Sequence, residues 1–267
     1  MKKPALRRER KGRGGAPERF ARALSVHARR SLALARKELI SYLSAPAFYG
    51  AAVFFLVFCS TWLFYFDNFF ALNAANTRPY LALFPFAFVI VVPMLTMKSW
   101  AEERKTGSLE LLLTMPFSEW DLVLGKFLSS YALLAMTIAL TIPLPLALLP
   151  MGNFDPGVIL GEYFGALLLG ASSIALGLLF SALSKNQAGS FLATAVALLL
   201  TLLVGQLAFS LNLPSRMTEA LNFFYLPFHF GSFSRGLLDS RGIFYYLASA
   251  WLFLFLTERA IRFRKWG

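Results

Sequence analysis

Long apolar segments alternate with short polar ones along most of the chain. Several of the apolar segments approach the ~20 residues that a helix needs to cross the ~30 Å hydrocarbon core of a membrane. The pattern therefore predicts an all-α membrane protein with six transmembrane helices. The expected spans are residues 47–66, 80–97, 123–149, 158–183, 188–211 and 242–257.

Two further segments are neither simple spans nor free loops. In residues 26–45, apolar side chains recur at helical spacing and four basic side chains lie away from their stripe, which predicts an amphipathic helix in the headgroup plane. The stripe consists of Leu32, Ala35, Leu39, Ile40 and Leu43. Residues 212–241 mix charged and aromatic side chains, so we expect short re-entrant or interfacial helices there, at the outer boundary before the sixth span.

A charged segment, residues 98–126, separates the second and third expected spans. It cannot lie in lipid, because ionised side chains are costly there. Inside it, Leu109, Leu112 and Leu113 occupy positions i, i+3 and i+4 and share one face of a short helix. Such a helix can pack on its own bundle as an elbow, or it can fit a groove on a soluble partner.

The turns on either side of this short helix follow from the residue types. Gly107 allows a tight turn before it. Pro116 ends it, because the residue before a proline avoids the α region. Ser118 and Asp121 have the spacing of a capping box for the next helix. The segment is therefore expected to hold one surface helix between two long ones.

Composition and charge give the orientation. The chain is 57% apolar and 15% charged, whereas soluble domains carry about 25% charged residues. Of the 26 Lys and Arg residues, 22 lie in the termini and loops that would share one side. Cytoplasmic loops are enriched in Lys and Arg, so both termini and residues 98–126 are expected to be cytoplasmic. This accounts for the net charge of +12 without nucleic acid.

The chain divides into two parts by composition. Residues 1–24 are rich in Lys, Arg, Gly and Pro, and they are expected to form a disordered basic tail that attracts anionic lipid headgroups. Residues 25–267 form the expected six-span membrane domain, placed in a bacterial cytoplasmic (inner) membrane.

Four stretches resemble a known family. The segment EERKTGSLELLLTMPFSEWDLVLGK is similar to the signature of type-2 ABC exporter permeases. RKELISYLSAPAFY and SALSKNQ resemble the family's helix before the first span and its turn between spans four and five. FHFGSFSRGLLDSRGIFYYLASAWLFLFLT is similar to the end of gliding-motility-associated ABC permeases. The resemblance covers roughly residues 30–267 and leaves the basic tail outside.

The resemblance implies a role for each part of the chain. The segment 98–126 would contain the coupling helix that meets a separate ATPase. Its implied contact residues are Glu102, Glu103, Gly107, Leu109, Glu110, Leu112 and Leu113. The outer re-entrant helices would include Pro227, His229, Arg235 and Asp239.

It also implies partners. These are two copies of an ABC ATPase, a second copy of this permease or a related one, and a further membrane subunit with a large extracytoplasmic domain. This chain would hold no cofactor, since ATP and Mg²⁺ would bind the ATPase. No phosphate-loop motif is present, and the glycine-rich run 165–173 has no lysine and is typical of helix packing.

Other functions stay open on sequence grounds. A membrane enzyme would need a reactive cluster, yet His27 and His229 are expected on opposite sides, and no HExxH or GxSxG motif occurs. A channel or secondary transporter would carry polar groups near mid-membrane, where these spans hold few. A permease for copper-enzyme maturation would share the same loop.

Overall fold

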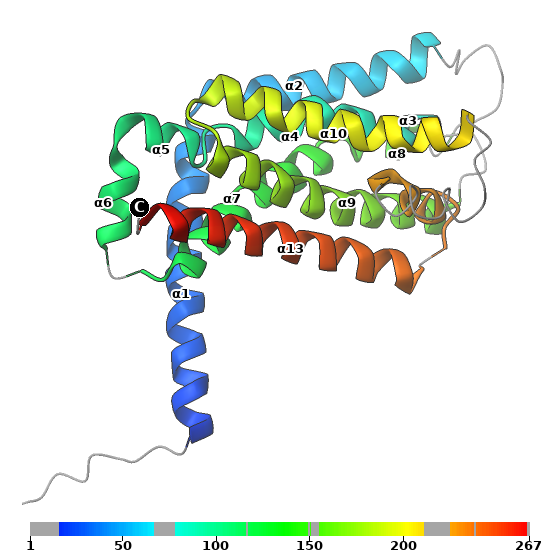
Figure 1. The fold of residues 1–267 in the computed structure, drawn as a ribbon. Helices are drawn as coiled ribbons and strands as arrows, with labels where there is room; N and C mark the ends of the chain where they lie inside the picture. Colours follow the sequence, from blue (N-terminus) through cyan, green and yellow to red (C-terminus); the bar gives the residue numbers. More distant parts are fainter. Residues whose placement is uncertain are drawn as a thin grey trace, which may run out of the picture.

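The computed structural model describes residues 16–66, 78–115, 117–148, 150, 155–210, 225–237 and 239–265. Over these residues every regular element is helical, which confirms the all-α class. The long helices run side by side in one bundle (Figure 1). They are α2 (Pro46–Thr61) with a following π-helical turn (Trp62–Phe66), α4 (Phe84–Thr96), α7 (Glu119–Ala139), α9 (Pro156–Leu183), α10 (Gln187–Ser210) and α13 (Ser240–Lys265).

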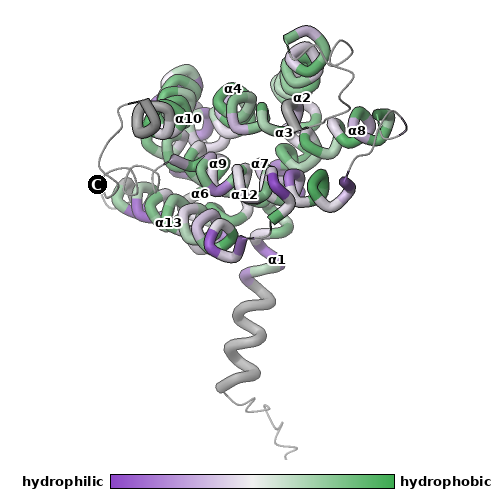
Figure 2. Tube along the Cα trace, turned by 90° about the vertical axis from the view of Figure 1, so that its right-hand side faces the viewer, coloured by the Kyte–Doolittle hydropathy of each residue, from purple (hydrophilic) through white to green (hydrophobic). Residues whose placement is uncertain are grey.

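Five helical stretches are long and apolar enough to cross a membrane, and they match the first five expected spans. These are Pro46–Phe66, Phe84–Thr106, Glu119–Leu148, Pro156–Leu183 and Gln187–Gly205. The sixth expected span lies in α13, which packs along α9. Its apolar run is short because Arg241 and Glu258 flank it, so a sixth crossing stays a prediction. Figure 2 shows the clustered helices mostly hydrophobic.

Two of the expected spans are divided into separate helices near prolines. The second span is split into α3 (Arg78–Ala82) and α4, and Pro85 lies in the first turn of α4. The third is split into α7 and α8 (Pro143–Leu148). A proline at the start of a helix is tolerated because the N–H groups there have no partner within the helix.

α9 is the central helix of the bundle, and small residues let its neighbours approach. A Cβ added at Gly165 would lie 2.7 Å from the Cβ of Phe233, and one at Gly177 would lie 2.5 Å from Thr96 Oγ1. Small residues permit this kind of close packing between membrane helices. The prediction that the run 165–173 serves helix packing is confirmed at Gly165 and Gly170.

α1 (Ala16–Leu43) crosses one end of the bundle and extends beyond it (Figures 1 and 2). It begins within the segment expected to be a disordered tail. Ala, Arg and Glu favour helix there, so the helix begins before residue 24, where the tail was expected to end. Residues 1–15 lie outside the described residues. The expected apolar stripe is divided between two faces, because Ala35 is buried whereas Leu32 and Ile40 are 66% and 56% exposed. A position in the headgroup plane stays a prediction.

Candidate functional site

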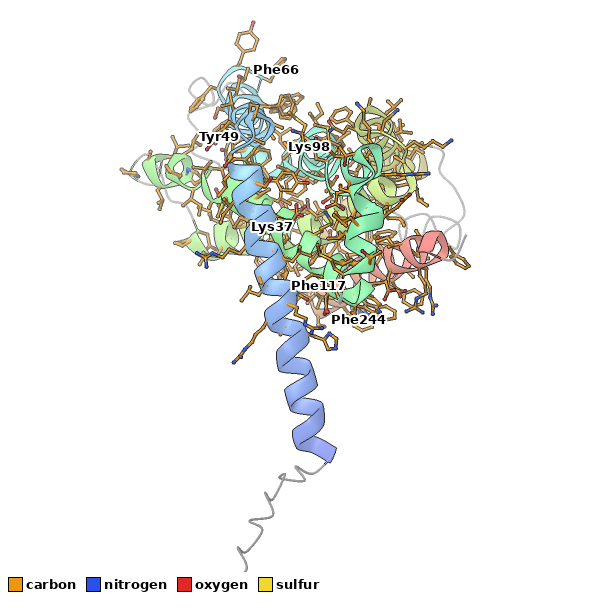
Figure 3. The ribbon with its side chains drawn as sticks, turned by 90° about the vertical axis from the view of Figure 1, so that its left-hand side faces the viewer. Lys37, Tyr49, Phe66, Lys98, Phe117 and Phe244 are labelled. Atoms are coloured by element: carbon orange, nitrogen blue, oxygen red, sulfur yellow. The ribbon has the colours of Figure 1, made fainter. Side chains whose placement is uncertain are left out.

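The candidate site consists of two short helices between α4 and α7: α5 (Ala101–Thr106) and α6 (Ser108–Thr114). They lie at the end of the bundle that α1 crosses and where α13 ends, here called the α6 end (Figure 1). Figure 3 views this end, with Lys37 on α1 and with Lys98 and Phe117 on the two sides of the short helices. The predicted short helix between the long ones is present as α6, and α5 is a second short helix that the sequence analysis did not predict.

Gly107 joins the two helices. Its φ of 73° lies in the left-handed region, which a residue with a Cβ adopts only at a cost. Around this turn, Thr106 Oγ1 lies 2.9 Å from Ser108 Oγ, and both hydroxyls also donate to the carbonyl oxygen of Glu103. The tight turn expected at Gly107 is therefore present, and it sets the angle at which α6 leaves α5.

α6 has two different faces. Leu109 and Leu112 are half-buried and pack against the bundle core. Leu111 and Met115 lie one helical turn apart and are 64% and 43% exposed, and Glu110 is exposed beside them. The side chain of Leu113 lies outside the described residues. The two leucines expected to anchor a partner thus hold α6 to its own bundle, and the exposed apolar pair was missed.

The capping box at the start of α7 is confirmed. Ser118 Oγ accepts a hydrogen bond from the Asp121 N–H at 3.2 Å, and the Asp121 carboxylate accepts one from the Ser118 N–H at 3.2 Å. Asp121 is almost fully buried and also contacts His27 Nδ1 of α1 at 2.9 Å. The cap therefore ties α1 to the point where the loop meets α7.

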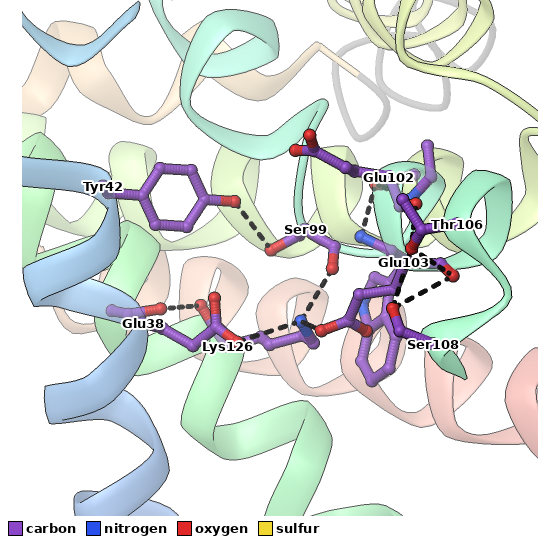
Figure 4. A network of polar contacts seen from close by, with 12 residues as sticks. Glu38, Tyr42, Ser99, Glu102, Glu103, Thr106, Ser108 and Lys126 are labelled. Atoms are coloured by element: carbon purple, nitrogen blue, oxygen red, sulfur yellow. Dashed lines mark hydrogen bonds and ion pairs between the residues drawn. The ribbon is translucent and has the colours of Figure 1, made fainter. Parts of the chain in front are cut away.

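A fully buried lysine lies beneath the two short helices (Figure 4). Lys126 Nζ donates to Glu103 Oε1 at 2.6 Å, to the Ser99 carbonyl oxygen at 2.7 Å and to Glu38 Oε1 at 3.4 Å. It also lies 4.8 Å from the ring centroid of Trp100. We call these five residues the Lys126 cluster. Glu103, expected to shape or contact an ATPase groove, is thus engaged inside the protein.

Hydrogen bonds also join α5 and the residue before it to the C-terminal end of α9 and the turn that follows. Ser181 Oγ accepts from the backbone N–H groups of Trp100 and Ala101 at 3.1 and 3.3 Å. Arg104 Nη1 donates to the carbonyl oxygens of Leu183 and Ser184 at 3.4 and 3.1 Å. The short helices are therefore held by α1, α7 and the α9–α10 turn.

An open pocket of about 350 Å³ lies between α1 and these helices. Lys37, Glu38, Lys98, Glu102 and Glu103 are among its lining residues. The charged lining is mixed, with two lysines and three glutamates, and two of those glutamates are paired with Lys126 outside the pocket. This mixture favours neither an anion nor a cation.

Tyr42 lines the same pocket and donates to Ser99 Oγ at 3.3 Å. Burial raises the pKa of its hydroxyl, so Tyr42 stays a neutral donor. Among the described residues, no three His, Cys, Asp or Glu side chains gather as a metal would require. That no cofactor binds this chain stays a prediction.

The outer candidates lie at the opposite end of the bundle, in η3 (Leu226–Phe228), α12 (Phe230–Phe233) and the turn before α13. The His229 ring packs at a tilt against the ring of Tyr245, with centroids 4.7 Å apart. Arg235 Nε donates to the Gly231 carbonyl oxygen, and Asp239 Oδ1 accepts from the Arg241 N–H.

Pro227 occupies the first turn of η3. Each of the four side chains thus has a local contact or position of its own. Residues 212–224 and 238 of this segment lie outside the described residues, so its re-entrant character stays a prediction.

Two signals in the sequence could have shown what was missed. Leu111 and Met115 have i, i+4 spacing on the face opposite the packed leucines. Lys126 is a cation at the start of a long apolar span, and such residues pair with partners inside the protein. Its partners Glu38 and Ser99 come from distant parts of the chain, and no local pattern links them.

Comparison with known proteins agrees with this architecture. Residues 47–257 match the family described as ABC-2 family transporter protein. The chain is also 30% identical over 115 residues to the probable multidrug ABC transporter permease YbhR of Escherichia coli K12, and equally to that of strain O157:H7. That alignment covers 43% of this chain but 31% of the relative, so it spans about a third of the relatives' length. The chain therefore belongs to the ABC-2 family of transporter proteins and is a multi-pass membrane permease component.

Proposed function

We propose that the chain is the permease subunit of an ATP-driven ABC transporter of the exporter type, and that α6 is its coupling helix. In this account α6 fits a groove on a separate ATPase subunit, which binds ATP and Mg²⁺. Family membership supports the permease role. The exporter type, the ATPase contact and the assembly are our inference.

The two-faced packing of α6 is the observation that carries this proposal. A short helix that only closed a loop would gain nothing from exposing Leu111 and Met115 to water, since burial of apolar side chains is what stabilises such packing. An apolar pair flanked by the exposed Glu110 is typical of a helix that lies in a partner's groove. Leu109 and Leu112 supply the rigid backing.

Because α5 is anchored to the bundle, a force on α6 at the ATPase contact would be passed to the membrane spans. Glu103, Arg104 and the backbone at Trp100 and Ala101 link this helix to α7 and to the α9–α10 turn. A push on α6 would therefore reach several spans together, as rigid-body switching requires. Closure of two ATPase subunits on ATP would supply that push.

The proposed assembly follows from this role. Two ATPase copies would serve two permeases, which are either identical or related. A further membrane subunit with a large extracytoplasmic domain belongs to the gliding-motility-type version of the proposal. The α6 end would face the cytoplasm of a bacterial inner membrane, together with both termini. The apolar spans suit a large amphipathic or lipid-linked cargo better than an ion.

Co-purification from the native membrane tests the proposal. The tagged chain in mild detergent should bring down a protein with ATPase activity, and Leu111→Asp should lose it. Leu237→Asp is the matched control, because Leu237 is 59% exposed but lies between α12 and the start of α13, at the opposite end of the bundle. If both variants retain the ATPase, α6 is not the contact. If the unaltered chain brings down none, the proposed ATPase partner and the coupling role of α6 are both contradicted.

A further inference from the structure

The Lys126 ammonium donates three hydrogen bonds, each to a residue in a different part of the chain. Glu38 belongs to α1, Ser99 lies between α4 and α5, and Glu103 belongs to α5 (Figure 4). Lys126 itself is fully buried on α7. An ammonium has three donors, so this side chain has no capacity left for a ligand or for chemistry. Its contacts instead connect three parts of the α6 end.

The surrounding packing strengthens the same connection. A Cβ at Gly125 would lie 2.7 Å from Leu34 Cδ2, so α1 is pressed against α7 next to the cluster. The contact between His27 and Asp121 ties the same two helices further along. Removing one member of a buried ion pair leaves an uncompensated charge. The helices therefore cannot separate at Lys126 without exposing it to water.

We propose that Lys126 is a positioning residue that locks α1, the α5–α6 pair and α7 into one rigid unit, so that a displacement of α6 also moves α1. The proposal deepens the coupling role of α6, and it rests on that role only for what displaces α6. The rigidity of the unit belongs to this chain alone.

The distances from the Lys126 ammonium to its two carboxylate partners predict which helix each substitution would release. Glu38 lies 3.4 Å from the ammonium and Glu103 lies 2.6 Å from it. Glu38→Gln should therefore weaken the hold on α1 while the pair between α5 and α7 remains. Lys126→Met should free all three helices, whereas Lys126→Arg keeps the charge.

Spin-label distance measurements on the full chain in lipid nanodiscs test this. The single cysteine, Cys59, is buried and can be replaced by alanine. One label pair, at exposed positions Glu110 and Arg36, joins α6 to α1. A second pair, Glu110 and the exposed Leu128, joins α6 to α7.

In the otherwise unaltered chain both distance distributions should be narrow. Glu38→Gln should widen or shift only the α6–α1 distribution, and Lys126→Met should widen both. Lys126→Arg should keep both narrow. With the co-purified ATPase, Mg-ATP and vanadate should leave both distributions of the unaltered chain unchanged, because the unit moves as one.

A triple variant separates the positioning role of Lys126 from a role in stability alone. The variant Glu38→Gln/Glu103→Gln/Lys126→Met has no charge left to bury, so it should keep its thermal unfolding midpoint. It should nevertheless widen both distributions. Narrow distributions in this variant, or in Glu38→Gln, would overturn the proposal, as would a nucleotide-driven change of the α6–α1 distance in the unaltered chain. The measurements without nucleotide need no ATPase, so they can fail or succeed independently of the proposed function.

Discussion

Arg104 Nη1 lies 3.1 Å from the carbonyl oxygen of Ser184, and this hydrogen bond joins α5 to the turn between α9 and α10. The same nitrogen also reaches the carbonyl oxygen of Leu183. These two carbonyls close the C-terminal end of α9, where the last carbonyls of a helix lack partners within the helix. A cation at that end is also favoured by the helix dipole.

Replacement of Arg104 should loosen this junction without unfolding the bundle. Arg104→Ala should lower the free energy of unfolding by about 1 kcal/mol, because hydrogen bonds from a charged donor are lost at a partly exposed site. Arg104→Lys should lose less, since one ammonium can still reach a carbonyl. The thermal unfolding midpoint in detergent measures both changes. A midpoint in Arg104→Ala equal to that of the unaltered chain would show that the junction is not stabilising.

Gly107→Ala tests the turn between α5 and α6. A Cβ at this position would meet no atom within 4 Å, so the cost should come only from the positive φ and amount to ~1–2 kcal/mol. Gly107→Asn should cost less, because asparagine tolerates the left-handed region. Gly231→Ala is the control, since that glycine has equal space and no positive φ. Equal thermal midpoints for Gly107→Ala and Gly231→Ala would argue against the turn geometry.

The central helix α9 offers a graded test of packing. Gly165→Ala should destabilise the bundle by about 1–3 kcal/mol, the usual range for overpacking, because the new Cβ meets Phe233 close to its backbone. Gly170→Ala should cost less, since its nearest neighbour is the flexible end of Leu134. The order of the two thermal midpoints checks this prediction, and a reversed order would contradict the packing described.

Orientation can be checked by labelling single cysteines in whole cells. With Cys59 replaced by alanine, Leu237→Cys should react with a membrane-impermeant maleimide added outside. Leu111→Cys should react only after the membrane is opened, because 22 of the 26 Lys and Arg residues are expected on its side. Labelling of Leu111→Cys in intact cells would reverse the proposed topology.

The sequence predicted the spans well, because apolar runs of this length have one simple explanation. It could not predict how the short helix faces its surroundings. Leu109, Leu111 and Leu112 are chemically alike, and only the angle set at Gly107 decides which of them meets the bundle. Periodicity identified the helix, but three-dimensional packing assigned its faces.

The Lys126 cluster was hidden for a different reason. Glu38 and Lys126 are far apart in the sequence and become neighbours only when α1 crosses the end of the bundle. Glu103 was assigned to the contact with the ATPase because family resemblance gives a position without the direction of its side chain. Burial of Lys126 explains why that carboxylate turns inward.

Photo-crosslinking from α6 would test the central claim most directly. A photoreactive phenylalanine analogue in place of Leu111 should, on illumination in intact cells, form an adduct with a protein that contains an ATP-binding phosphate loop. The same analogue in place of Leu237 should form no such adduct. An ATPase crosslinked only from position 111 is the result that the coupling-helix account predicts. No ATPase adduct from position 111, or equal adducts from both positions, would contradict it.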